Sequence, residues 1–173
     1  MFNQEVVLRK FEERDIDNKV KWINDSNNNK FLHYDLPLEH VKTLNWFLKN
    51  KDRIDRYDAV IEYEGKPVGI IGLLGIDNKN RKAEYYITMG EHEYKGKGIA
   101  FKASQELLRY AFNELNLNKV YLYTEVENTP AQGLFNKLGF EKEGTLKEDL
   151  IINNQKKDRY IYGVFKDRWN KEV

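Results

Sequence analysis

The feature that most constrains the fold of this chain is a glycine-containing corner between a strand-like run and a long amphipathic run. Residues 83–89 (AEYYITM) have the composition of a β-strand, the corner follows at residues 94–102 (YKGKGIAFK), and apolar side chains then recur every three or four positions over residues 98–115. Gly96 and Gly98 lack a Cβ, so successive backbone N–H groups can turn toward one point. The helix that starts there adds unpaired N–H groups and the positive end of its dipole. The corner therefore predicts a phosphate-binding turn between a strand and a helix.

The same periodicity predicts the remaining elements. Strands are expected at residues 5–10, 56–63, 68–75, 83–89, 119–126, 140–152 and 158–165. Helices are expected at residues 14–25, 38–48, 98–115 and 130–138, the last with Thr129 as N-cap and Pro130 at the first helical position. This order predicts a mixed α/β (α+β) sheet flanked by about four helices, in a single domain over residues 1–173.

Composition excludes several classes of function. The chain has 29 basic and 28 acidic residues, for a net charge of +1, so it lacks the basic surface of a nucleic-acid-binding protein. It contains no cysteine, which rules out disulfides, thiolate metal sites and a cysteine nucleophile. No run approaches the ~18 apolar residues of a membrane span, and the N-terminus does not resemble a signal peptide. We expect a cytoplasmic chain that binds no nucleic acid, no membrane and no metal.

Three known phosphate-binding designs can be tested against the corner. A P-loop requires Ser or Thr after a Gly-Lys pair, and here Gly98 follows Lys97. A dinucleotide fingerprint requires a third glycine where this chain has the bulky Phe101. The pyrophosphate loop of acyl-CoA-binding enzymes, [Q/R]-x-x-G-x-[G/A], is met from Lys95 to Ala100, with Lys in place of Gln or Arg. The third design is therefore the best supported.

A second segment strengthens that interpretation. Residues 128–140 (NTPAQGLFNKLGF) resemble the N-x-x-[A/S]-x-x-L-Y-x-[K/R]-x-G-F element that accompanies this loop in GNAT-superfamily acetyltransferases. The resemblance covers residues 7–169, and its last part is similar to the subgroup of ribosomal-protein alanine acetyltransferases and spermidine acetyltransferases. Some acetyltransferases of nucleotide-linked amino sugars look alike too. The implied fold is a mostly antiparallel seven-stranded sheet that is splayed between its fourth and fifth strands.

What the resemblance implies is direct transfer of acetyl from acetyl-CoA to a primary amine. Backbone groups near Ile87 and Met89 would pair with the pantetheine arm and polarise the thioester carbonyl. Asn128 and Lys137 match positions of the second element that contact the cofactor. The residues expected to hold the pyrophosphate are Lys95, Gly96, Lys97, Gly98, Ile99 and Ala100.

The resemblance also suggests catalytic groups. An ammonium must lose a proton before it attacks, and Glu84 matches a strand glutamate that can serve as base, unless it faces solvent or pairs with a neighbouring cation such as Arg81 or Lys82. Phe135 stands where the family often has a tyrosine, and Phe cannot protonate the leaving thiolate. Tyr123, Tyr86 or a water are the candidates that would replace it.

The segment after the first strand usually borders the acceptor in this family. Trp22, His33, Tyr34 and Asp35 are the expected acceptor contacts, with His33 as an alternative base and Trp22 as an alternative core residue. The predicted partner is a small-molecule amine or a peptide N-terminus, a nucleotide-linked amino sugar being a leading option and a polyamine a further one. A homodimer is the candidate assembly. The rival function, motivated by Phe135, is an acyl-CoA-binding regulatory module without turnover.

Overall fold

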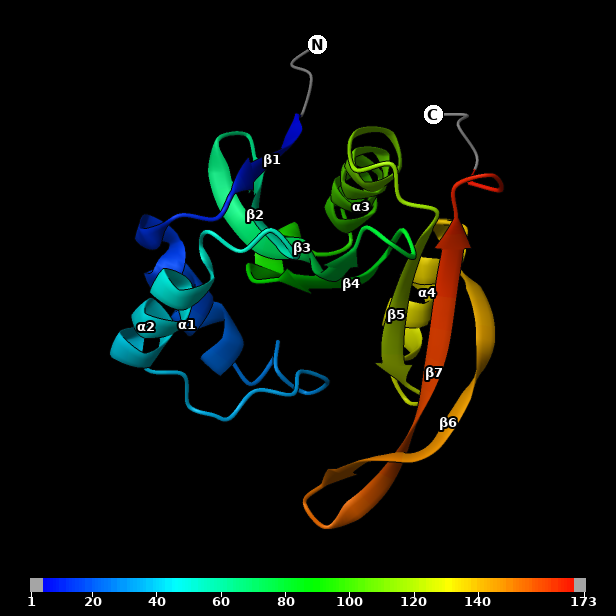
Figure 1. Cartoon of the computed structure of the whole chain (residues 1–173). Coiled ribbons are helices and arrows are strands. Elements are labelled where there is room, and N and C mark those ends of the chain that lie inside the picture. Colours follow the sequence, from blue (N-terminus) through cyan, green and yellow to red (C-terminus); the bar gives the residue numbers. More distant parts are fainter. Residues whose placement is uncertain (1–4, 170–173) are drawn as a thin grey trace.

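A seven-stranded sheet runs through the structure, a computed structural model that describes residues 5–169 (Figure 1). Its strand order is β1-β2-β3-β4-β5-β7-β6, and every pair of neighbours is antiparallel except β4 and β5. The strands are β1 (Val6–Lys10), β2 (Arg56–Tyr63), β3 (Lys66–Asp77), β4 (Lys82–Met89), β5 (Lys119–Glu125), β6 (Glu141–Ile152) and β7 (Gln155–Phe165).

Four α-helices and three short helical turns connect these strands. The helices are α1 (Ile16–Asn24), α2 (His40–Asn50), α3 (Ile99–Arg109) and α4 (Thr129–Lys137). The turns are η1 (Glu13–Asp15), η2 (His92–Tyr94) and the π-helical η3 (Tyr110–Glu114), which continues α3. The predicted order of strands and helices is confirmed, as are the mixed sheet and its separation between β4 and β5.

Some predicted boundaries are wrong. The run expected as one helix over residues 98–115 is α-helical only to Arg109 and then widens into the π turn, which apolar spacing alone does not distinguish. The N-cap of α4 is Asn128, whose side-chain oxygen accepts a hydrogen bond from the Ala131 N–H at 3.4 Å. Thr129 is the first helical residue instead of the cap.

Two hydrophobic cores lie on opposite faces of the sheet. Successive residues of β2 point to alternate faces, so Ala59 and Ile61 join the larger core while Val60 joins the smaller one. The larger core packs the sheet against α3 and α4, and the smaller core packs it against α1 and α2. The sheet therefore fixes the positions of both helical layers around the place where β4 and β5 separate.

The pairing of β4 with β5 is short. Only three residue pairs connect the strands, and the last joins Glu84 to Tyr121. Beyond Glu84 the two strands separate at a wide angle and leave a V-shaped opening, while β4 stays paired with β3 along the same stretch (Figure 1). The β4 edge after Glu84 thus keeps backbone groups that no neighbouring strand uses.

None of the helices within residues 5–169 combines the length with the apolar character that crossing a membrane requires.

Candidate active site

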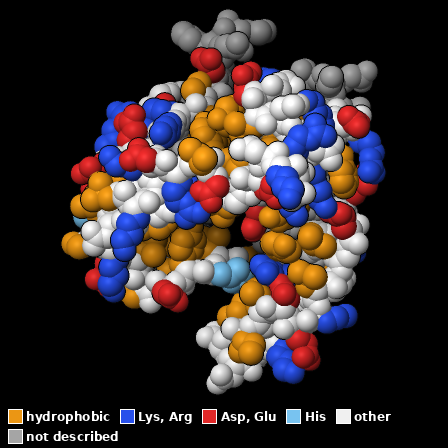
Figure 2. All heavy atoms as spheres, in the orientation of Figure 1, with side chains coloured by type: hydrophobic (Ala, Val, Ile, Leu, Met, Phe, Trp, Pro, Cys, Tyr) orange, Lys and Arg blue, Asp and Glu red, His pale blue; other side chains and the backbone are white. Residues whose placement is uncertain are grey.

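A cavity of about 640 Å³ lies where β4 and β5 diverge. Its walls come from both strands, from α1, from α4 and from the loop of residues 25–39. This loop connects α1 to α2 and crosses the opening between β4 and β5 (Figure 1). Figure 2 shows the molecule hollowed here, with hydrophobic side chains on both sides of the hollow. The opening in the sheet is therefore an accessible site and is not filled by side chains.

Half of the residues that the sequence singled out contribute to this cavity. The predicted site residues in its lining are His33, Tyr34, Glu84, Ile87, Met89, Lys95, Tyr123 and Asn128. The predicted site residues outside the lining are Trp22, Asp35, Gly96, Lys97, Gly98, Ile99, Ala100 and Lys137. Most of the residues outside the lining belong to the corner of residues 95–100, which follows β4 and adjoins the cavity.

The expectation that Trp22 contacts the acceptor is wrong. Its side chain is 1% exposed and belongs to the smaller core. Its indole N–H donates to the Glu91 carboxylate at 2.8 Å, and its ring fills the space that a side chain on Gly90 would need. Asp35 is exposed and lies outside the cavity lining, so it makes no contact with this site in the structure.

The glycine corner has the predicted geometry. Gly96 has φ 75° and Gly98 has φ 77°, both in the left-handed region that favours glycine. Gly98 is the N-cap of α3, and a Cβ on either glycine would meet no atom within 4 Å. The first N–H groups of α3 have no partner within the helix, because the first internal bond runs from Lys102 N–H to the Gly98 carbonyl. The corner therefore fits a diphosphate, which exposed amides and a helix N-terminus bind well.

The side chains of this corner serve other contacts. Ile99 is 2% exposed and packs in the larger core, so only its backbone is available to a ligand. Lys95 donates to the Asn28 side-chain oxygen at 2.6 Å, and the Lys97 ammonium lies 5.2 Å from the centre of the Tyr94 ring. Lys137 is exposed in the last turn of α4.

Glu84 occupies the vertex of the opening, as the last residue of β4 that pairs with β5. Its side chain is half-buried in the cavity wall; burial raises the pKa of its carboxyl group, and the nearby charge of Arg159 partly opposes this rise. Among residues 5–169 it forms no salt bridge, which argues against the alternative in which it pairs with Arg81 or Lys82. A carboxylate with a raised pKa beside a cavity is suited to accept a proton.

Phe135 is buried and lines the cavity beside the ring of Tyr85, 6.0 Å away between centroids. The Tyr85 hydroxyl is hydrogen-bonded to the Ser104 hydroxyl. Ser104 donates its own proton to the Ala100 carbonyl, so Tyr85 is the donor to Ser104. The Tyr86 hydroxyl donates to Asp58. Neither hydroxyl is free to protonate a thiolate.

Tyr123 differs from these tyrosines. Its hydroxyl has no hydrogen-bond partner within the described part of the chain, and its ring lies 4.7 Å from the Arg159 guanidinium. Tyr123 also lines the cavity. It is therefore better placed than Tyr86, the other tyrosine considered from the sequence.

A row of polar groups at the β2 side of the cavity was not predicted. The strand register aligns Asp58, Gly72 and Tyr86 across β2, β3 and β4. A Cβ on Gly72 would lie 2.6 Å from a carbon of the Tyr86 ring, so glycine lets this ring cross β3 and donate its hydroxyl to the Asp58 carboxylate at 2.6 Å. Asp58 also accepts two hydrogen bonds from the Arg56 guanidinium, at 2.6 and 2.9 Å. Lys19 of α1 lies beside this row.

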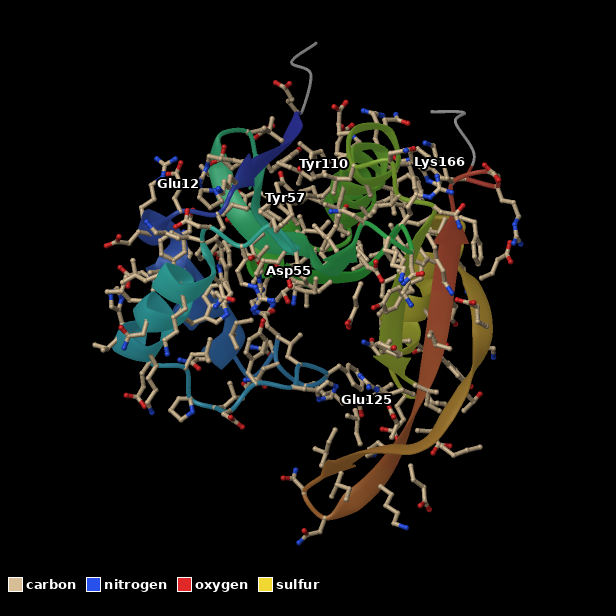
Figure 3. All side chains as sticks on the ribbon, viewed as in Figure 1. Glu12, Asp55, Tyr57, Tyr110, Glu125 and Lys166 are labelled. Carbon is tan, nitrogen blue, oxygen red and sulfur yellow. The ribbon has the colours of Figure 1, made fainter. Side chains whose placement is uncertain are left out.

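Glu125, at the end of β5, was also missed. It is 5% exposed, and its Oε2 atom has no hydrogen-bond partner among the described residues. The His33 Nε2 atom lies 3.6 Å from that oxygen, so the loop of residues 25–39 meets β5 here (Figure 3). The alternation of a strand could have found it, because Tyr121, Tyr123 and Glu125 share one face of β5.

Comparison with known proteins identifies the family. The model of the acetyltransferase (GNAT) domain matches residues 5–141. The chain belongs to the GNAT acetyltransferase family. Members of this family use acetyl-CoA, so the resemblance stated from the sequence and the class of cofactor are both confirmed.

Several relatives of this GNAT chain have names. It is 36% identical over 110 residues to a spermidine N(1)-acetyltransferase of Escherichia coli, covering 64% of this chain and 59% of that protein. It is 36% identical over 117 residues to a Bacillus subtilis protein named as a ribosomal N-acetyltransferase, YdaF, covering 66% of this chain and 62% of that protein. The matched part thus spans about three fifths of these two curated relatives.

A solved relative covers nearly the whole chain. The spermidine N-acetyltransferase of Vibrio cholerae, in complex with CoA and spermine, superposes with a TM-score of 0.87 and 28% identity over 94% of this GNAT chain and 96% of its own. Another structure of that protein is described as dodecameric, so the relative forms an assembly larger than a dimer.

Proposed function

We propose that this chain transfers acetyl from acetyl-CoA to the primary amine of a small polar acceptor. The observation that carries the proposal is the V-shaped opening between β4 and β5, with Glu84 at its vertex and a cavity of about 640 Å³ inside it. The opening provides unpaired strand backbone for the pantetheine arm, and the glycine corner at the end of β4 provides amides for the diphosphate. Both features belong to one continuous stretch of chain.

Each group of the chain then has a defined task. Acetyl-CoA supplies the activated acetyl group. Glu84 accepts the proton that the acceptor ammonium loses, directly or through a water, and unpaired N–H groups of β4 near Ile87 and Met89 stabilise negative charge on the carbonyl oxygen. Tyr123 donates a proton to the leaving thiolate. Asn128 caps α4 at the edge of the cavity and thereby holds the opposite wall in place.

The acceptor belongs to the same proposal. A nucleotide-linked amino sugar or a peptide N-terminus remains the leading option, because the cavity mixes aromatic rings such as that of Tyr34 with polar groups of both charges. Polyamines, the further option from the sequence, are supported by two relatives that bear the name spermidine N-acetyltransferase. A homodimer and a cytoplasmic location stay predictions.

The test is a measurement of free thiol released from acetyl-CoA with a panel of amines that includes an amino-sugar nucleotide, an alanyl peptide and spermidine. We expect release that depends on one class of amine and is lost in Glu84→Gln. Tyr123→Phe, which keeps the ring, tests the proton donor separately. Tight CoA binding with no release on any amine would favour the rival regulatory module.

A further inference from the structure

Lys19 is a buried cation without a carboxylate partner. Its side chain comes from α1, the residue is 6% exposed, and it contributes to the lining of the cavity. Its ammonium lies 3.3 Å from the centre of the Trp46 ring and 5.8 Å from that of Phe11. Among residues 5–169 no carboxylate oxygen lies within 4.0 Å of the ammonium. Burying a charge is costly unless an opposite charge accompanies it, and the ring faces compensate only in part.

The neighbours of Lys19 do not neutralise it. From β2, Arg56 and Asp58 pair with each other, so their charges cancel and the charge of Lys19 remains. Tyr34 of the loop and Tyr86 of β4 face the same space, and the pKa of each hydroxyl is raised by burial and by Asp58, so both are neutral near pH 7. Desolvation lowers the pKa of Lys19 to about 8. This end of the cavity thus has an excess of one positive charge and attracts an anion.

Arg56 indicates how far the Lys19 ammonium lies from the reaction centre, because both cations lie over the ring of Trp46. The register aligns Arg56, Leu74 and Glu84 across β2, β3 and β4, on the same face of the sheet as Asp58 and Tyr86 and two residues further along the strands. Two strand spacings separate Arg56 from Glu84, which is about 10 Å between Cα atoms. A small molecule with an amine at one end and an anionic group at the other can span that distance.

Resting on the proposed acetyltransferase function, we propose that the acceptor is an amine that also carries an anionic group, a carboxylate or a phosphate ester, which Lys19 binds while the amine lies at Glu84. A polyamine has no such group, and an ammonium placed at this end of the cavity would be repelled by the charge of Lys19.

The buried carboxylate of Glu125 does not reverse this inference. Glu125 is four residues beyond Tyr121, the partner of Glu84, and so lies about 13 Å further along β5. It is next to His33 at the opposite side of the cavity from α1 (Figure 3). A molecule that joins Glu84 to Lys19 does not reach it.

The experiment compares matched acceptors in the wild type, Lys19→Met and Lys19→Arg. One pair is O-phosphoethanolamine with ethanolamine, a second is β-alanine with β-alaninamide, and spermidine is the polyamine. We expect the wild type to favour the anionic member of at least one pair by about tenfold or more in kcat/KM, the effect of a hydrogen bond to a charged group. Lys19→Met abolishes the preference and Lys19→Arg keeps most of it. The two pairs distinguish phosphate from carboxylate.

The pH dependence provides a second readout on the wild type. Lys19 must be protonated to bind the anion, so the preference falls as the pH rises through about 8. In Lys19→Arg the preference persists to higher pH, because arginine keeps its charge. The phosphate ester completes its second ionisation near pH 6 and does not titrate in this window.

Binding measurements separate this inference from the proposed function. Calorimetry with CoA present measures the affinity for O-phosphoethanolamine and ethanolamine even if no amine is acetylated. Tighter binding of the anionic compound that is lost in Lys19→Met supports the role of Lys19 even where turnover is absent. A wild type that prefers spermidine or the neutral members, or a Lys19→Met that retains the anionic preference, overturns it. CoA affinity and thermal melting verify that each variant folds, and the pH series on the wild type decides the matter if Lys19→Met does not fold.

Discussion

At the scale of single residues, the cavity holds ionisable side chains that the folded protein alone does not satisfy. Glu84 is half-buried with a raised pKa, Lys19 is buried without a carboxylate partner, and Glu125 has a buried oxygen without a hydrogen bond in the described residues. Each is unfavourable in the folded state, and residues of this kind concentrate at functional sites. The expected compensation is a bound molecule with complementary charges.

For Glu84→Gln, we expect turnover to fall by roughly 10²–10⁴-fold, the usual contribution of a general base. In the wild type, activity declines as the pH falls through the raised pKa of Glu84, because the protonated group cannot accept a proton. The variant loses that acidic limb. A pH profile of kcat under saturating acetyl-CoA measures the change, and an identical limb in both proteins would exclude Glu84 as the base.

Glu84→Gln, which should lower turnover, should raise the stability of the folded protein. Because folding raises the pKa of Glu84, the protonated carboxyl group favours the folded state. This contribution to the free energy of unfolding is complete below the pKa of the unfolded state and is lost as the pH rises through the pKa of the folded state. Near pH 7 the charged group is therefore unfavourable, and Glu84→Gln should melt at a higher temperature than the wild type. A lower melting temperature at pH 7 would contradict the burial argument.

Gly98 allows a matched pair of substitutions at the corner. Gly98→Ala adds only a methyl group at φ 77° and should cost roughly 1–2 kcal/mol of stability with a modest loss of CoA affinity. Gly98→Glu places a negative charge among the amides that are expected to hold the diphosphate, so CoA binding should be abolished. Calorimetric titration with CoA compares the two. Equal CoA affinity in the wild type and Gly98→Glu would place the diphosphate elsewhere.

At the scale of elements, the loop of residues 25–39 is tied to the turn between β4 and α3. Asn28 donates to the carbonyls of Trp22 and Gly90 at 3.1 and 3.0 Å, and it accepts from Lys95 at 2.6 Å. Asp25 and His92 form a second contact of 2.8 Å. The loop that covers the acceptor end is thus fastened to the corner that is expected to bind the cofactor.

Asn28→Ala tests this coupling. It removes three hydrogen bonds and leaves two carbonyls without their donor, which should cost about 1–3 kcal/mol. We expect KM to rise for both acetyl-CoA and the acceptor, with a smaller change in kcat, because neither Glu84 nor Tyr123 is touched. Asn27→Ala, in the same loop, is the control. A rise in the acceptor KM alone would show that the loop and the corner are independent.

At the scale of the whole molecule, β6 is an exposed edge of the sheet. Six of its twelve residues are charged, and its pairing with β7 shifts register twice, features that discourage strand addition by another chain. Its distal part nevertheless exposes Ile151, at 74%. This end of the β6–β7 hairpin projects away from both cores (Figure 1).

We expect backbone amides of residues 148–157 to exchange with solvent orders of magnitude faster than those of β3 in dilute protein, because no core covers them. Hydrogen exchange at two protein concentrations measures this, alongside sedimentation to determine the oligomeric state. Slow exchange that depends on concentration would identify the hairpin as an assembly contact, as in a homodimer or a larger assembly.

The order of the elements and the backbone geometry of the glycine corner could be predicted from the sequence. Apolar periodicity is a local property, and the left-handed turns at Gly96 and Gly98 follow from the missing Cβ, so both could be predicted without knowing any distant neighbour. Glu84 was proposed as the base from the resemblance to the GNAT family, because local periodicity places it only in a strand.

Which side chains meet depends on how the helices and the loop pack on the sheet. Trp22 could have faced a ligand or the core, and Gly90, 68 residues along the chain, supplied the space that buried it. Lys19 became a cavity residue because α1 packs on the face of the sheet formed by β2 and β3. Glu125 meets His33 because the loop crosses the opening in the sheet. These contacts join residues far apart in sequence, and their energies depend on burial, which no local pattern contains.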